Sequence, residues 1–135
     1  MSAQTPDRPT TILTEDECWE FLEGQTVGRL ATAVGGDPEI FPVNFAVAER
    51  QVYLKTRPGT KLVEIAVNSH VAFEADEWGP DVARSVVLKG TAEILDHDAD
   101  LAAAEATGLR SYLQDGKNVW VRIAPAEVSG RRLSR

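Results

Sequence analysis

The stretch TRPGTK, residues 56–61, places two cations and two hydroxyls in a turn that could bind an anion. Arg57 can hold a phosphate through two parallel hydrogen bonds, and Lys61 adds a compact positive charge. Thr56 and Thr60 add hydroxyl donors. The turn leads into a helix-like run, so a helix N-terminus would also face the anion. Short motifs often match by chance, so on this pattern alone a phosphate site and a turn with solvated cations remain equally open.

A second basic and hydroxyl pair, Arg84-Ser85, stands before a long strand-like run. This pair could complete the same pocket. The alternative is a salt bridge at the edge of a sheet, which would have no role in binding.

The other residues that could bind a metal or act as a nucleophile form no recognisable site. His70 and His97 lie far apart without a second ligand at metal-binding spacing, so we expect no metal site. Cys18 falls on the apolar face of a predicted helix and is expected to be a core residue. The sequence contains no Gly-x-Ser-x-Gly, P-loop or Gly-x-Gly-x-x-Gly motif, which removes the usual support for serine hydrolases, P-loop enzymes and Rossmann domains.

Composition limits the class of protein. The chain has 135 residues, which fits one domain, and its net charge of −7 argues against binding to nucleic acid. A single cysteine excludes an intrachain disulfide. No signal-like or membrane-spanning run is present, so we expect a cytoplasmic protein that does not bind a membrane.

Periodicity and turn signals predict a mainly β (α+β) fold. The polar start, residues 1–12, is expected to be a flexible tail, and residues 13–135 form the domain. Thr14 and Glu17 form a predicted capping box for the first helix, which Gly24 ends. The predicted helices are 13–24, 61–67 and 96–108, the last capped near Asp96 or Asp98. The predicted strands are 26–34, 39–48, 51–56, 70–76, 84–95 and 118–123.

The order of these elements favours a small barrel. The first three strands are too closely spaced for parallel crossovers, so they should form an antiparallel meander. Gly90 within a long strand indicates a bulge or a barrel bend. We therefore expect six antiparallel strands with helices packed outside them.

Several segments in this order resemble the pyridoxamine 5'-phosphate oxidase-like proteins, the flavin-binding split β-barrels. The resemblance runs from about Leu13 to Leu133. It rests on GRLAT at 28–32, PEIFPVNFAV at 38–47, VYLKTRPGTKL at 52–62, VAFEAD at 71–76, RSVVLKGTAEIL at 84–95 and VSGRRL at 128–133. It implies a six-stranded antiparallel split β-barrel with peripheral helices.

The resemblance also implies a homodimer that holds two FMN molecules at its interface and reduces a small organic substrate. The strand PVNF would lie along the flavin ring. The strand LKT, residues 54–56, and the turn after it would hold the ribityl chain and phosphate, which places Lys55 and Lys61 on the cofactor. Trp120 would reach the flavin of the partner. The implied cofactor-binding residues are Val43, Asn44, Phe45, Lys55, Thr56, Arg57, Thr60, Lys61, Arg84, Ser85 and Trp120.

The chain departs from the family in ways that limit its activity. True pyridoxamine phosphate oxidases carry a C-terminal Arg-x-His, whereas no histidine follows His97 here, so oxidation of vitamin B6 is not expected. Thr60 stands where nitroimidazole-reducing relatives often have a histidine. Some relatives bind the deazaflavin F420, and the excess of Arg over Lys, ten to four, keeps F420 open. A non-catalytic flavin- or haem-binding protein and an interaction domain with a vacant pocket also remain open, and the sequence does not indicate the substrate.

Overall fold

The computed structural model describes residues 10–110 and 118–135, so the first nine residues of the predicted tail lie outside it. The chain forms, in order, β1 (Thr10–Ile12), α1 (Glu15–Glu23), β2 (Val27–Val34), β3 (Asp37–Ala48), β4 (Gln51–Thr56), α2 (Thr60–Val67), β5 (His70–Trp78), β6 (Val82–Ile94), α3 (Asp98–Ala106) and β7 (Val119–Ser134). No helix in this part of the chain is long and apolar enough to cross a membrane.

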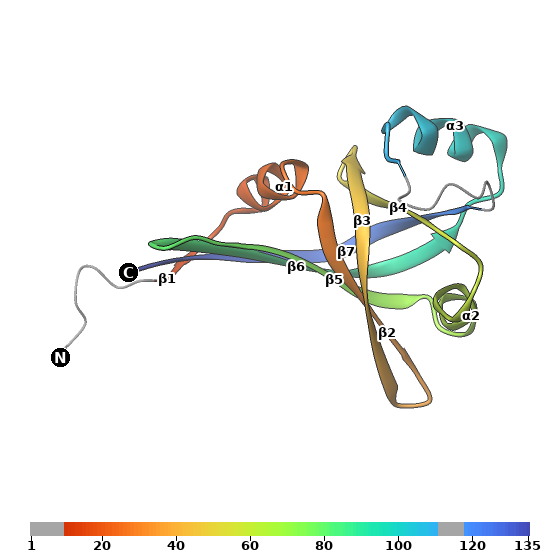
Figure 1. Ribbon diagram of the computed structural model, residues 1–135, viewed down its shortest axis with the longest axis horizontal. Helices are drawn as coiled ribbons and strands as arrows, with labels where there is room; N and C mark the ends of the chain where they lie inside the picture. Colours follow the sequence, from red (N-terminus) through yellow and green to blue (C-terminus); the bar gives the residue numbers. More distant parts are fainter. Residues whose placement is uncertain (1–9, 111–117) are drawn as a thin grey trace.

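All the strand pairs are antiparallel, and together they close a ring. The strand order is β1-β7-β4-β3-β2-β5-β6, and β6 pairs again with β7. The predicted six-stranded antiparallel split barrel is therefore confirmed. The three helices lie outside the strands, with α2 and α3 toward one end and α1 toward the other (Figure 1).

The ends of the chain differ from the prediction. Thr10–Ile12 forms a seventh strand, paired with residues 131–133, within the segment expected to be a flexible tail. The last strand was predicted to end at residue 123 but continues to Ser134 and pairs with the whole length of β6. Pro125, Glu127 and Gly130 weaken the local strand signal there, whereas the partner strand supplies the hydrogen bonds that hold it extended.

Gly90 marks a break in the register between β6 and β7, as predicted. Gly90 pairs with Pro125 and Lys89 with Glu127, so the longer strand carries one extra residue. A Cβ on Gly90 would lie 2.0 Å from the carbonyl oxygen of Ala124. The close approach of the two backbones therefore requires glycine at this position.

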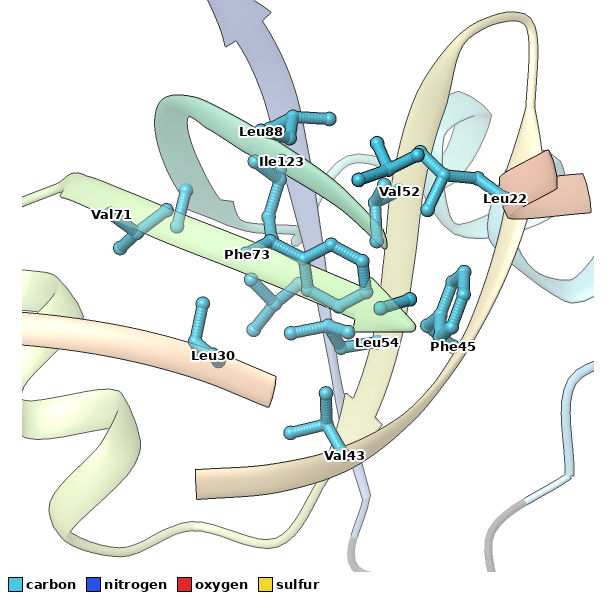
Figure 2. Packing of buried hydrophobic residues seen from close by; sticks show 14 of the residues in the cluster. Leu22, Leu30, Val43, Phe45, Val52, Leu54, Val71, Phe73, Leu88 and Ile123 are labelled. Atoms are coloured by element: carbon cyan, nitrogen blue, oxygen red, sulfur yellow. The ribbon is translucent and has the colours of Figure 1, made fainter. Parts of the chain in front are cut away.

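The interior of the barrel is filled by apolar side chains that alternate along the strands. Phe45 and Phe73 meet edge to face, with ring centres 4.8 Å apart. Figure 2 shows Val43 and Phe45 on β3 and Leu54 on β4 converging on Phe73 from β5. Phe41, Val43, Phe45 and Val47 all contribute to this core, so the intervening residues of β3 face outward.

The first turns of α1 and α3 are capped differently. α1 has the predicted capping box: the Thr14 hydroxyl accepts from the amide of Glu17, whose carboxylate accepts from the amide of Thr14. α3 instead begins after His97, which makes no side-chain cap bond, so the predicted aspartate cap is wrong. Asp98 and Asp100 lie inside its first turn, where their negative charges interact favourably with the helix dipole without capping an amide.

Candidate functional site

A groove runs along the outer face of β3 and β4. It consists of two adjoining hollows, of about 290 Å³ and about 660 Å³, which share Asn44, Leu109 and Arg110. The smaller hollow ends at the turn 56–61, and the larger continues along β3 toward the end of α1. Together they are large enough for a cofactor of moderate size, since ligand sites typically span about 300–1,000 Å³.

The turn before α2 forms the basic end of the groove. Lys55, Thr56, Arg57 and Lys61 line the smaller hollow, and Arg110 faces them from the chain after α3. α2 begins at Thr60 without a side-chain cap, and the amides of Leu62 and Val63 donate to the Gly59 carbonyl. Among the described residues, this leaves the two amides before them for an outside partner. This end of the groove is thus positive in a protein whose net charge is −7.

Lys61 is the strongest sign that an anion belongs at this end. Its ammonium lies 3.3 Å from the Thr56 hydroxyl oxygen and 5.3 Å from the centre of the Phe41 ring. Within residues 10–110 and 118–135, no carboxylate lies within 4.0 Å of it. Burial lowers the pKa of Lys61, because a half-buried ammonium without a counter-ion loses hydration. A bound phosphate would supply that counter-ion.

The position of α2, and therefore of Lys61, is set by two polar contacts with β2. The buried hydroxyl of Thr32 donates to the Glu64 carboxylate at 2.5 Å. The side-chain amide of Asn68 donates to the Ala33 carbonyl at 2.9 Å. These contacts tie the middle and the C-terminal end of the short helix to the barrel.

The β3 residues expected along the flavin ring line the groove. Val43 and Asn44 line the smaller hollow, and Asn44 and Phe45 line the larger one. The Phe45 ring itself is buried in the core, so it is the backbone of this residue that can face a ligand. The side-chain amide of Asn44 donates to the Thr26 carbonyl at 3.2 Å, which holds the end of β2 against β3.

Lys55 and Trp120 are arranged differently from the expectation. Trp120 is 4% exposed and packs under α3, so within this chain it is a core residue and does not line the groove. The Lys55 ammonium lies 5.0 Å from the centre of the Trp120 ring and 3.8 Å from a carboxylate oxygen of Glu105. Lys55 therefore borders the smaller hollow while its charge is directed toward α3.

Arg84 and Ser85 do not complete the pocket within one chain. Arg84 lies at the far end of the barrel, where it donates to Glu77 at 2.6 Å and lies over the Phe21 ring. The salt bridge at a sheet edge, the alternative interpretation, is therefore what the chain itself forms. Thr60 starts α2 but does not line either hollow.

Sequence reasoning missed Leu109 and Arg110, which form the wall of the groove opposite β3. They follow α3, where Gly108 has a φ of 75° and turns the chain. The signal in the sequence is the helix-ending glycine with a basic residue two positions later. Only the fold shows that this turn meets the β3–β4 face.

Known proteins resemble this chain along most of its length. The family profile described as pyridoxamine 5'-phosphate oxidase matches residues 14–132. A solved FAD-binding protein from Mycobacterium smegmatis is 38% identical, with a TM-score of 0.84 over 93% of this chain and 99% of that one. A solved FAD-binding protein from Mesorhizobium loti is 27% identical, with a TM-score of 0.77 over 93% of this chain and 99% of that one.

A relative with a named reaction matches a shorter stretch. The 5a,11a-dehydrotetracycline/5a,11a-dehydrooxytetracycline reductase of Streptomyces rimosus is 34% identical over 84 residues, which are 56% of this chain and 59% of the reductase. The match of the family profile, the closed split barrel and the similar flavin-binding structures agree with one another. The chain belongs to the pyridoxamine 5'-phosphate oxidase family of flavin-binding split barrels.

Proposed function

We propose that the protein is a flavin-dependent oxidoreductase that binds FMN in the β3–β4 groove and reduces a small organic substrate. The observation that carries the proposal is the half-buried Lys61 ammonium, which has no carboxylate partner in the described part of the chain and lies at the basic end of the groove. The two similar FAD-binding proteins and the partly similar reductase support the cofactor class and the reaction class.

The residues of the groove fit an FMN molecule. Lys61 and the first amides of α2 would hold the phosphate, and Thr56 and Arg57 would add donors. The outward backbone from Val43 to Phe45 would meet the polar edge of the ring, and Leu109 would cover an apolar part of it. The bound flavin would supply the two-electron transfer, while the protein contributes binding, orientation and exclusion of water.

We further propose a homodimer, because Arg84 and Ser85, which are expected in the site, lie away from it within a single chain. Thr56 pairs with Val119 and Arg84 with Arg132, and these β7 positions are about 40 Å apart along the strand at about 3.3 Å per residue. Only a second copy can bring Arg84 and Ser85 to the groove. Light scattering should then give twice 14.7 kDa, and a monomer in the presence of cofactor would contradict the dimer.

The identity of the cofactor can be tested by absorption spectroscopy and by analysis of the cofactor that is released on denaturation. Protein purified from a flavin-rich host should show the two-banded absorption of a flavin, and denaturation should release FMN. Release of FAD instead would identify the cofactor as FMN extended by an adenylate, the cofactor of the two similar FAD-binding proteins, and would leave the proposed phosphate site unchanged. A single deazaflavin band would support F420, an intense Soret band would support haem, and failure of every flavin to bind would refute the proposal.

A further inference from the structure

Helix α3 and the groove wall after it rest on a small apolar cluster on the outer face of β4 and β7. The buried members of this cluster are Tyr53, Leu95, Ala104 and Trp120. Leu109 packs against the cluster and also lines both hollows of the groove. Any movement of α3 on the barrel is therefore transmitted to the groove through Leu109.

Lys55 lies where this cluster meets the groove. Its ammonium is 5.0 Å from the centre of the Trp120 ring and 3.8 Å from Glu105 Oε1. The same carboxylate oxygen accepts a hydrogen bond from Trp120 Nε1 at 3.0 Å. The side chain of Lys55 is 21% exposed and that of Glu105 is 65% exposed, so the ammonium is largely shielded by the protein whereas water still reaches the carboxylate. The three side chains thus connect β4, β7 and α3.

Glu105 also contacts the turn that leads from α3 into the groove wall at Leu109. Its carbonyl oxygen accepts from the amide of Gly108 at 3.1 Å. Gly108 turns the chain with its positive φ, and the amide of Leu109 then donates to the Thr107 hydroxyl at 3.3 Å. Fixing the Glu105 side chain therefore fixes the last turn of α3 and the direction in which Leu109 leaves it.

We propose that Lys55 is a positioning residue of the flavin groove, which holds α3 through Glu105 and Trp120 and so places the Leu109 wall. This inference rests on the proposed function. It differs from the role that the family resemblance implies for Lys55, which is direct contact with the ribityl chain or the phosphate. The geometry favours the indirect role because both partners of the ammonium lie on the side of α3.

The first test needs no flavin. Hydrogen exchange of the Thr107 and Gly108 amides should be faster in Lys55→Met than in wild type, by roughly three- to tenfold, because an ion pair and a cation–π contact are lost. Lys55→Arg keeps both contacts and should restore slow exchange. Lys61→Met is the matched control, since it removes a lysine charge from the same groove without touching α3. Unchanged exchange in Lys55→Met would overturn the proposed anchor.

The second test uses flavin affinity. Lys55→Met should weaken the binding of FMN and of riboflavin by the same factor, roughly three- to tenfold, because the Leu109 wall lines both hollows of the groove. In a Leu109→Ala background the substitution should have no further effect, since the wall it places is gone. If Lys55→Met lowers the affinity for FMN alone, or lowers flavin affinity just as much in the Leu109→Ala variant, Lys55 binds the cofactor directly and the inference is overturned. Failure of wild type to bind any flavin would instead refute the proposed function, and the exchange experiment would still test the anchor.

Discussion

Replacing Lys61 by Met should remove the preference of the protein for FMN over riboflavin. The methionine keeps the length of the side chain and its contact with Phe41 but loses the ammonium that faces the smaller hollow. A hydrogen bond from a charged group contributes about 1.5–3 kcal/mol. Because each 1.4 kcal/mol is tenfold, the affinity for FMN should fall by about 10- to 100-fold, whereas riboflavin, which has no phosphate, should be little affected.

The assay is titration of the apo-protein with each flavin, followed by the quenching of flavin fluorescence. Lys89→Met is the matched control, because it changes the net charge equally from an exposed position on β6, outside the groove. This variant should bind both flavins as wild type does. If wild type binds riboflavin as tightly as FMN, or if Lys61→Met keeps full affinity for FMN, the phosphate does not bind at this turn and the reasoning fails.

The same substitution should not destabilise the apo-protein. Burial lowers the pKa of Lys61 in the folded chain, so the folded state disfavours the charged form relative to the unfolded state. This penalty is present at neutral pH, begins to decrease as the pH rises through the lowered pKa of the folded state, and is lost only above the ordinary pKa of 10.5. Thermal unfolding of Lys61→Met at neutral pH should therefore occur at the wild-type temperature or above it. A lower temperature would show that the Lys61 charge stabilises the fold, contrary to this reasoning.

Three further predictions follow from the geometry. The advantage of FMN over riboflavin should decrease as the pH is raised toward 10.5, because the lowered pKa of Lys61 brings its deprotonation to a lower pH; titrations from neutral to alkaline pH measure this. Gly28→Ala should destabilise the fold by about 1–3 kcal/mol in urea unfolding, since its Cβ would lie 2.5 Å from the Phe73 ring. Thr14→Ala should cost about 1 kcal/mol and lower the midpoint of thermal unfolding without changing flavin affinity, because it removes the α1 cap shared with Glu17.

The elements of the barrel were predictable from local patterns. Phe41, Val43 and Phe45 stand at alternate positions in the sequence and share the inward face of β3, and the capping box marked the start of α1. These features depend on neighbouring residues, so their physics is contained in short stretches of sequence. The long β7 was only partly predictable, because its second half is held extended by β6 and β1 rather than by its own residue preferences.

The candidate site divides in the same way. The charges and hydroxyls of the turn 56–61 are visible in the sequence, and so is the helix start beside them. What only the tertiary structure decided is which distant groups reach that turn. It brings Leu109 and Arg110 to the groove, directs the Lys55 charge toward α3, and leaves Arg84 at the opposite end of the barrel. Residue type sets what a side chain can bind, whereas the closure of the barrel sets which side chains share one cavity, because strand pairing joins positions far apart in the chain.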